Sequence, residues 1–317
     1  MDSTNYAPIV LFVYNRPEHT KRTVEALLSN PEAKNSDLFI FADGPKPTIT
    51  DAGFKKLKDT REYIHQISGF KRIVIDESEV NRGLAEATIR GCSLVIEKYG
   101  KMIMIEDDDV PTPFFLHFMN ECLRRYEDNN KVWSVCGFVD SNAMPSKFGD
   151  EAFFVNRPSS WGFGTWKRCW DKVIWDKDIL RGIFRHKDII RGFDKWGGRD
   201  HYHTMYNLLL NQNSSWSIRY HFAAYLSDSY SIYPIKSLIE NIGLDGSGTH
   251  CGNEVKLVDI MDRNINIPNT IKFDSRKNRS YIKSFYPLDV RLRFTYFLLY
   301  HPVLFSFLKK VHKILKK

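Results

Sequence analysis

Four short apolar runs that alternate with helical stretches constrain the fold of this chain more than any other feature. The runs cover residues 8–14, 37–42, 71–75 and 102–105. Apolar runs this short, bounded by turn residues, are typical of buried strands, and the segments at 18–29 and 84–98 have helical spacing. Strands that alternate with helices favour right-handed crossovers, so the sequence predicts a parallel sheet in a three-layer α/β arrangement.

Charged residues stand at the ends of these runs. Arg16 lies in an Asn-Arg-Pro turn after the first run, and Asp43 lies in an Ala-Asp-Gly-Pro turn after the second. Arg82 belongs to the Asn-Arg-Gly turn that opens the helical stretch at 84–98. Because ligands of parallel sheets bind at the carboxyl ends of the strands, we expect these side chains to converge near Asp107, after the fourth run.

The fourth run ends in four adjacent carboxylates with no basic residue among them: Glu106, Asp107, Asp108 and Asp109. Adjacent acids repel one another, so either a cation gathers there or solvent separates them. Mg²⁺ and Mn²⁺ prefer oxygen ligands and leave positions open for substrate phosphates. Most acidic clusters are solvated loops, but the buried strand that feeds this cluster favours a metal–phosphate site.

The ordered series of four strand-end motifs resembles the GT-A glycosyltransferases, and within them the N-acetylglucosaminyltransferase I type and its bacterial relatives. The match covers about residues 7–140 well and resumes more loosely at 159–166 and near Asp200. It appears again at 232–243 and 248–250. The resemblance implies a Rossmann-like nucleotide-sugar domain, with a mixed sheet flanked by helices.

This resemblance also divides the chain. A GT-A catalytic domain is expected over residues 1–265, with a nucleotide-binding half at about 7–140 and an acceptor half at about 141–265. Residues 266–317 are expected to form a basic, amphipathic, helical C-terminal tail.

The resemblance implies a role for individual residues. Asp108 matches the metal ligand of the family's acidic triplet and would bind Mn²⁺ or Mg²⁺. Asp109 stands where relatives carry an apolar residue, which leaves open whether Asp108 or Asp109 is the principal ligand. Asp43 suits hydrogen bonding to the uracil or ribose of a UDP-sugar. The full donor-binding set implied is Arg16, Asp43, Arg82, Glu106, Asp107, Trp161 and His250.

Inverting sugar transfer needs a carboxylate base near the acceptor hydroxyl. Asp200 is the candidate, because it opens a helical stretch where relatives place their base. The preceding Arg199 could lower its pKa and weaken it as a base. The competing interpretation is that Asp200 is a helix N-cap, and Asp194 and Glu240 are the next candidates for the base.

Aromatic and histidine residues offer further hypotheses. Trp161 is expected at the donor-sugar or acceptor site and Trp170 in the core. His250 lies in a late loop that closes over the pyrophosphate in relatives, although a surface histidine is an equal alternative. His201 and His203 suggest zinc weakly, since residues two apart point to different faces of a helix.

The net charge of +8 is concentrated at the C-terminus. Residues 271–317 contain 12 Lys and Arg against 2 Asp and Glu, and their apolar part at 294–308 is too short to span a bilayer. Such a segment fits either an interfacial contact with anionic lipid or a packed terminal helix. A nucleic-acid partner is not expected, because stacking motifs and known binding folds are absent.

Cysteine usage favours a reduced compartment. The five cysteines are odd in number and unclustered, and no signal peptide precedes the first run. We expect a cytoplasmic protein, peripheral at the inner face of the cell membrane.

The sequence therefore predicts a metal-dependent glycosyltransferase that moves a hexose or N-acetylhexosamine from a UDP-sugar to a hydroxyl of a glycan or lipid-linked glycan. Inversion, and a place in bacterial surface polysaccharide synthesis, are expected. The alternative is a nucleotidyltransferase or other nucleotide-sugar enzyme on the same core. Against it, the turn at 14–17 lacks the Gly-rich phosphate loop of nucleotidyltransferases. A glycan-binding module ranks third, since binding alone does not explain the acids.

Overall fold

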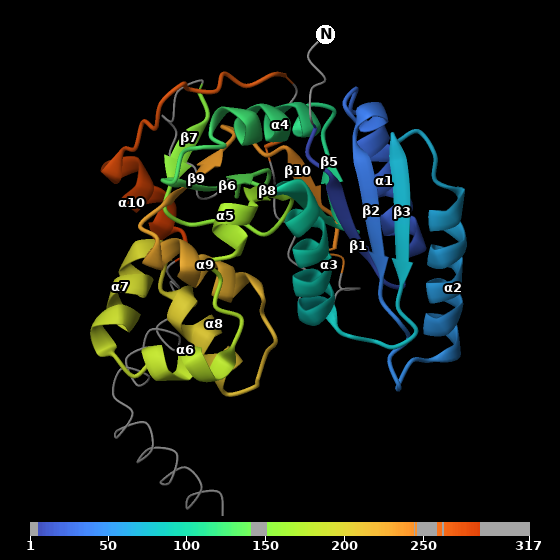
Figure 1. Ribbon diagram of the computed structural model, residues 1–317, viewed down its shortest axis with the longest axis horizontal. Coiled ribbons are helices and arrows are strands. Elements are labelled where there is room, and N and C mark those ends of the chain that lie inside the picture. Colours follow the sequence, from blue (N-terminus) through green and yellow to red (C-terminus); the bar gives the residue numbers. More distant parts are fainter. Residues whose placement is uncertain (1–5, 141–150, 244, 246–258, 262, 286–317) are drawn as a thin grey trace, which may run out of the picture.

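A computed structural model of the chain describes residues 6–140, 151–243, 245, 259–261 and 263–285 (Figure 1). The strands are β1 (Ile9–Val13), β2 (Asp37–Ala42), β3 (Arg72–Glu77), β4 (Lys101–Glu106), β5 (Asp109–Pro111), β6 (Val132–Cys136), β7 (Phe153–Val155), β8 (Phe163–Trp166), β9 (Tyr230–Tyr233) and β10 (Ile239–Asn241). The helices are α1 (Pro17–Leu28), α2 (Asp51–Gln66), α3 (Leu84–Tyr99), α4 (Phe115–Arg125), α5 (Lys167–Trp170), α6 (Lys177–Ile183), α7 (Lys187–Gly197), α8 (Asp200–Leu209), α9 (Ser217–Leu226) and α10 (Ser275–Lys283), with a 3-10 turn η1 at Ala33–Asn35.

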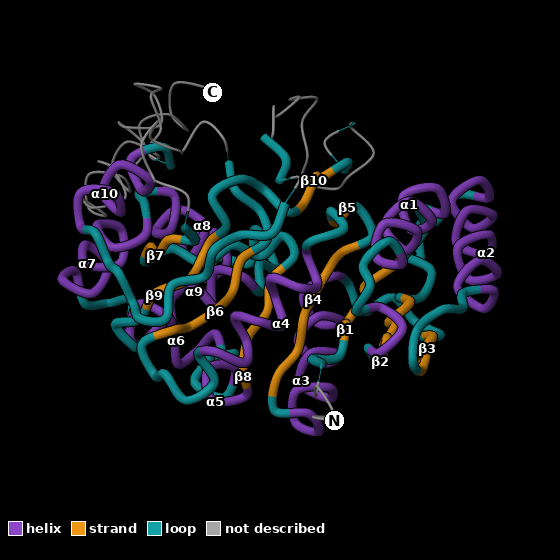
Figure 2. The backbone as a smooth tube through the Cα atoms, turned by 90° about the horizontal axis from the view of Figure 1, so that it is seen from above, coloured by secondary structure: helices purple, strands orange, loops and turns teal. Residues whose placement is uncertain are grey.

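The first four predicted strands form the parallel half of an eight-stranded sheet. The order of that sheet is β3-β2-β1-β4-β8-β6-β9-β7, and β1 pairs in parallel with both β2 and β4. Figure 2 shows α1 and α2 on one face of this half and α3 on the other. The carboxyl ends of β1, β2 and β4 therefore meet at one edge, as the sequence predicted.

The second half of the sheet is mixed. β8 is antiparallel to both β4 and β6, β9 is parallel to β6, and β7 is antiparallel to β9. The expectation of a mixed α/β sheet flanked by helices is confirmed, whereas the all-parallel pattern holds for the first four strands alone. A separate ribbon pairs β10 with β5 in antiparallel fashion, directly after the acidic strand end (Figures 1 and 2).

The central strands are apolar because both of their faces are covered. Every residue of β1 is buried, and Met102 to Ile105 of β4 have no exposed surface. A strand enclosed between helical layers needs a continuous apolar run, not an alternating one. The four short runs of the sequence are the consequence of this enclosure.

Four helices, α6 to α9, gather beside the mixed half of the sheet (Figure 1). Their shared core is formed by Leu180, Phe193, Met205, Leu208, Ile218 and Phe222. Phe193 of α7 packs on Phe222 of α9, with ring centroids 5.1 Å apart. This helical group sets the position of the first residue of α8, Asp200.

The described part of the predicted tail packs on the sheet. Asn266 forms a bridge to Glu151 and Phe273 forms one to Phe154, while Tyr281 and Ile282 of α10 join the buried cluster against β7. Residues 286–317, with the apolar and lysine-rich segment, lie outside the described residues. Within the described ranges, no helix has both the length and the apolar character needed to cross a membrane.

The cysteines that the structure describes are all buried and free: Cys92, Cys122, Cys136 and Cys169. This agrees with the expectation of reduced thiols. Cys251 lies outside the described residues.

Gly162 and Gly100 provide a test of backbone packing. Both glycines have a positive φ, 56° at Gly162 and 73° at Gly100. A Cβ added at Gly162 would lie 2.7 Å from the Ile239 side chain, whereas a Cβ added at Gly100 would have no atom within 4 Å. Gly100→Ala should lower the free energy of unfolding by about 1–2 kcal/mol, the cost of a left-handed residue. Gly162→Ala should lower it more, because Ile239 must also move. Urea denaturation measures both, and equal losses would contradict the packing constraint.

Candidate active site

The acidic strand end lies against Arg16. Because β1 and β4 are parallel neighbours, the turn after β1 reaches the carboxylates after β4. Arg16 Nη1 donates to Asp108 Oδ2 over 2.7 Å and lies 3.8 Å from Asp107 Oδ1. The arginine side chain is 18% exposed, so this ion pair is partly withdrawn from water. The structure thus brings together Arg16, Asp107 and Asp108, as the sequence predicted.

Two acids of this cluster, Glu106 and Asp107, hold their protons more tightly than ordinary carboxylic acids do. Burial, and then the charge of Asp108, raises the pKa of Asp107 to about 7. Burial, and then the three neighbouring carboxylates, raises the pKa of Glu106 well above its usual range. One guanidinium therefore does not offset the mutual repulsion of the cluster, and additional positive charge would stabilise it.

Asp109 has a different environment from Asp108. It is fully buried, and its carboxylate accepts from the backbone N–H of Gly162 at 3.1 Å and from Asn241 Nδ2 at 3.0 Å. The N–H of Glu106 adds a third contact at 3.3 Å. The hydrogen bonds of Asp109 thus link β5 to β10 and to the turn before β8.

Asp108 is the more open of the two acids. Among the described residues, its Oδ1 accepts one hydrogen bond, from Asn241 Nδ2 at 3.4 Å, and its Oδ2 accepts from Arg16. Gly243 lies directly over it, since a Cβ there would come within 1.9 Å of Oδ2. The geometry favours Asp108 over Asp109 as a metal ligand and shows why residue 243 has no side chain.

The side chains available as metal ligands fit an ion that takes few ligands from the protein. In the part of the chain that the structure describes, no three His, Cys, Asp or Glu side chains converge on one point. Mg²⁺ is commonly bound through one or two carboxylates, with water and substrate phosphates as its other ligands. Asp108 Oδ1, beside acids whose mutual repulsion Arg16 does not offset, suits that arrangement.

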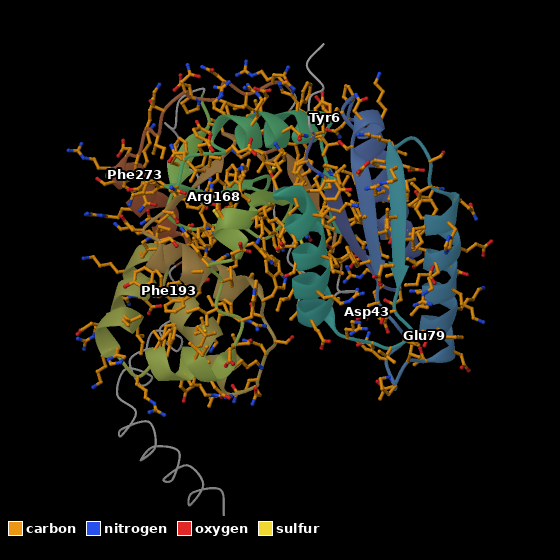
Figure 3. The ribbon with its side chains drawn as sticks, in the orientation of Figure 1. Tyr6, Asp43, Glu79, Arg168, Phe193 and Phe273 are labelled. Atoms are coloured by element: carbon orange, nitrogen blue, oxygen red, sulfur yellow. The ribbon has the colours of Figure 1, made fainter. Side chains whose placement is uncertain are left out.

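Asp43 organises the neighbouring strand end (Figure 3). Its carboxylate accepts from Asn81 Nδ2 at 2.9 Å and from the backbone N–H groups of Gly44, Arg82 and Gly83 at 2.9, 2.8 and 3.0 Å. The carboxylate therefore fixes the turn that opens α3. The Arg82 side chain points to Glu86, 3.4 Å away.

A cavity of about 350 Å³ is lined in part by residues 159–161, which directly precede Gly162. Its aromatic lining consists of Phe138, Trp161, Tyr233, Tyr281 and Phe285. Its charged and imidazole lining consists of Asp140, Arg157, Asp200, His201 and His221. The structure thus brings Trp161 and Asp200 to one cavity. Trp170 is buried and donates to Ser93 Oγ at 2.9 Å, as expected for the core.

Asp200 is held by an arginine that the sequence analysis did not single out. Arg157 Nη1 donates to Asp200 Oδ1 at 2.8 Å, and Nη2 donates to Oδ2 at 2.7 Å. Helix α8 begins at Asp200, its N-cap is Arg199, and no side chain caps it. The N-cap interpretation is therefore wrong, because both carboxylate oxygens turn toward Arg157. Asp194 is buried and accepts from the N–H of Tyr202, while Glu240 is exposed on β10.

Two buried imidazoles lie beside this ion pair. His201 Nε2 and His221 Nδ1 are 3.1 Å apart. His201 Nδ1 and His221 Nε2 are buried without a hydrogen-bond partner among the described residues. His203 lies two residues along α8 and contacts Asn207 instead, so the structure does not bring it to His201 as a zinc ligand. His250 lies outside the described residues.

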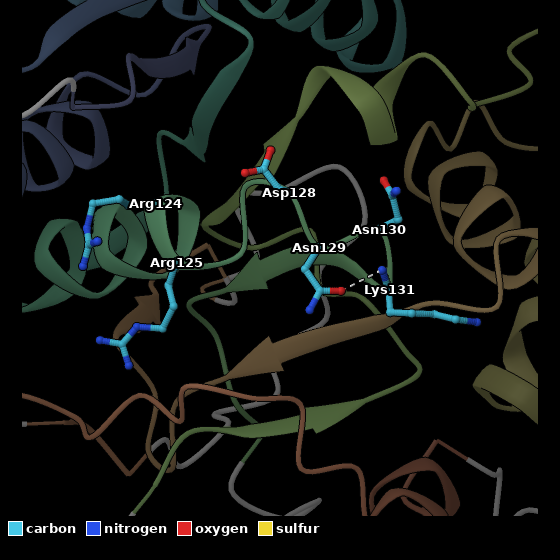
Figure 4. Close-up of a pocket in the computed structure, with 6 residues that line it drawn as sticks. All are labelled: Arg124, Arg125, Asp128, Asn129, Asn130 and Lys131. Atoms are coloured by element: carbon cyan, nitrogen blue, oxygen red, sulfur yellow. Dashed lines mark hydrogen bonds between the residues drawn. The ribbon is translucent and has the colours of Figure 1, made fainter.

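A second depression lies at the end of α4 (Figure 4). It is lined by Arg124, Arg125 and residues 128–131. Arg124 pairs with Glu121 at 2.8 Å, and Lys131 pairs with Asp228 at 2.7 Å. Since these cations already have acidic partners, we place the candidate site at the acidic strand end and the Trp161 cavity.

No family model and no curated protein matches the chain. Among solved structures, a mannosyltransferase from Pyrobaculum calidifontis in complex with GDP-Man and Mn²⁺ aligns with a TM-score of 0.35 and 10% identity, over 53% of this chain and 47% of that one. TarS from S. aureus aligns with a TM-score of 0.41 and 10% identity, over 74% of this chain and 36% of TarS. The 1–349 fragment of TarS gives the same score and identity, with 59% of the fragment covered.

The chain thus spans between about a third and three fifths of the structures it resembles. At 10% identity and TM-scores under 0.5, these likenesses assign no activity or substrate to it. The function is therefore inferred from the residues of the site.

The histidine pair predicts a pH dependence of stability. Burial, and then Arg157, lowers the pKa of His201 well below its usual value, and burial, His201 and Arg157 do the same for His221, with Asp200 opposing. The unfolded imidazoles take up protons near pH 6.5 while the folded ones stay neutral. The free energy of unfolding should therefore fall as the pH falls below about 6.5, by up to about 1.4 kcal/mol per pH unit for each histidine.

Urea denaturation between pH 5 and 7.5 measures this slope. His221→Asn should reduce it, while His186→Asn, at an exposed position directly before α7, should leave it unchanged. An unaltered slope in His221→Asn would show that the imidazole is not kept neutral by the fold.

Proposed function

We propose that this chain is a metal-dependent glycosyltransferase of the GT-A type. The observation that carries the proposal is the link made by Asp109. Its carboxylate joins the acidic strand end to the Gly162 turn, and this turn carries Trp161 into the cavity that holds Asp200. An anion-handling site and a polar, aromatic cavity with its own carboxylate thus adjoin each other, as transfer between two substrates requires.

The donor side is built from strand ends. Asp108 would hold Mn²⁺ or Mg²⁺ through its open oxygen, with Asp107 beside it. When bound there, the cation would supply positive charge against the diphosphate that leaves the sugar. Arg16 orients Asp108 and adds its own charge near the same point. Asp43 holds the 81–83 turn, whose backbone would border the nucleoside.

On the acceptor side, Asp200 would accept the proton of the attacking hydroxyl. Arg157 fixes the direction of both carboxylate oxygens, and each oxygen keeps a second lone pair for a hydroxyl. Trp161 would lie along the sugar. With Asp200 as a base, transfer would be inverting and would form no covalent intermediate.

We propose a UDP-sugar as the donor and a hydroxyl of a glycan or lipid-linked glycan as the acceptor. This activity would serve bacterial surface polysaccharide synthesis at the cytoplasmic face of the membrane. Residues 1–265 would form the catalytic domain, and the basic segment within 266–317 would contact anionic lipid. A nucleotidyltransferase is less well supported, since α1 begins at Pro17 without a Gly-rich loop before it.

A panel of nucleotide sugars, scored for release of the nucleoside diphosphate, tests the activity. Release should require Mn²⁺ or Mg²⁺ and stop in excess EDTA. Asp108→Ala should reduce it by at least about 10²-fold, because the ligand that orients the cation is lost. The fold should persist, since the substitution removes hydrogen bonds to Arg16 and Asn241 at the sheet edge and leaves the apolar core unchanged. Asp59→Ala, at an exposed acid on α2, is the matched control and should keep full activity. Release that survives EDTA, or an active Asp108→Ala, would reject the metal role.

The proposed base predicts a second result. Asp200→Asn should cut turnover about 10²–10⁴-fold, because proton removal from the acceptor is lost. Nucleotide affinity should hardly change, since Asp108 and Arg16 are untouched. The variant should also lose about 1–3 kcal/mol of stability, because Arg157 is left without a carboxylate partner.

Asp200→Glu separates these two effects, since it retains the charge near Arg157 and should recover stability more than turnover. Asp188→Asn, at an exposed position on α7, controls for loss of a charge. Normal turnover in a folded Asp200→Asn protein would contradict the assignment.

A further inference from the structure

We propose that residues 241–243, at the end of β10, position the carboxylate of Asp108, and that Asn241 sets the direction of that carboxylate. Asn241 and Asp108 are 133 residues apart in the sequence, and a hydrogen bond joins their side chains. The inference rests on the proposed function, because Asp108 is the acid that would hold the cation. It gives Asn241 the role of a positioning residue, which acts through Asp108.

The ribbon of β5 and β10 brings this segment to Asp108. Asn241 pairs with Asp109 in antiparallel register. The next residue, Ile242, donates its backbone N–H to the carbonyl oxygen of Asp108 at 2.8 Å. The backbone of the acid is therefore held by the same segment that contacts its side chain.

The amide of Asn241 contacts both neighbouring acids. Its Nδ2 donates to Asp109 Oδ1 at 3.0 Å and to Asp108 Oδ1 at 3.4 Å. Its Oδ1 accepts from the backbone N–H of Gly243 at 3.0 Å. Because the amide oxygen alone can accept from an N–H, this last bond turns the NH₂ group toward the two carboxylates. The direction of the amide is thus fixed from within the segment.

Gly243 limits the other oxygen of the same carboxylate. Asp108 Oδ2 accepts from Arg16 Nη1 at 2.7 Å, and a Cβ added at Gly243 would lie 1.9 Å from this oxygen. The φ of Gly243 lies outside the left-handed region, so the neighbouring carboxylate, and not the backbone conformation, excludes a side chain there. Asp108 is therefore confined at Oδ1 by Asn241 and at Oδ2 by Arg16 and Gly243.

This confinement matters for binding a cation through few protein ligands. A carboxylate that is already oriented loses less rotational freedom when it binds the ion, so its affinity for the ion is higher. An amide suits this task because it donates a hydrogen bond without bringing a positive charge that would compete with the cation. Side chains that orient a metal ligand in this way typically contribute about 10–100-fold to metal affinity.

The Mn²⁺ requirement of nucleotide binding tests the role of Asn241 without any sugar transfer. Equilibrium dialysis of the full chain with trace UDP or GDP, over a series of Mn²⁺ concentrations, gives the concentration for half-maximal binding. Asn241→Ala should raise this concentration about 10–100-fold, and excess Mn²⁺ should restore nucleotide binding. The variant also removes a donor from Asp109, so it should be less stable. Gly100→Ala, at the opposite end of β4, is the destabilised control and should keep the wild-type Mn²⁺ requirement.

Gly243→Ala separates position from stability. Its Cβ would meet the end of a side chain that can rotate, so Asp108 should shift away from Arg16 while the rest of the fold stays in place. The Mn²⁺ requirement should rise about tenfold or more, with a Tm close to that of the wild type.

A wild-type Mn²⁺ requirement in folded Asn241→Ala or Gly243→Ala would overturn the positioning role alone. Nucleotide binding by the wild-type chain that does not depend on Mn²⁺ would overturn it together with the metal role of Asp108. A raised requirement in both variants, without transfer from any nucleotide sugar, would support the positioning role and reject the proposed transferase activity.

Discussion

The buried carboxylate of Asp109 is the interaction on which the rest of this structure depends. It accepts hydrogen bonds from three separate segments: the acidic strand end itself, the Gly162 turn and Asn241. A buried carboxyl group is costly unless donors satisfy its oxygens, so these three segments must stay together. Loss of any one donor would leave the carboxylate under-bonded. The site geometry on both sides of Asp109 is therefore fixed by one side chain.

The two sides of the site have different structural origins. The acidic end comes from a parallel sheet, where Arg16 and Asp108 follow adjacent strands in a fixed register. The cavity comes from the junction of the mixed half of the sheet with the helical group, where Arg157 meets Asp200 across 43 residues. The first arrangement follows from local strand order, whereas the second requires the packing of α7, α8 and α9.

This difference explains what could be predicted from the sequence. Strands β1, β2 and β4 were located within about two residues because each is an apolar run, and their parallel order placed Arg16 beside the acids. Arg157 and His221 could not be found in this way, since each has its partner on a distant element. Helix α2 was not predicted because it buries few residues, Leu57, Thr60 and Ile64, and so has a weak apolar pattern. Asp200 was correctly taken as a helix start, but its arginine partner was expected at 199, next in sequence, not at 157.

Among the described residues, the Asp43 carboxylate is held by dipoles and not by a cation. Three of its four hydrogen-bond donors are backbone N–H groups and the fourth is an amide. Such dipoles neither titrate nor exchange with dissolved ions. Ionic strength acts on pairs of full charges, and most strongly on exposed ones. The turn that opens α3 should therefore keep its shape across a wide range of salt, giving the site one border that is insensitive to its ionic surroundings.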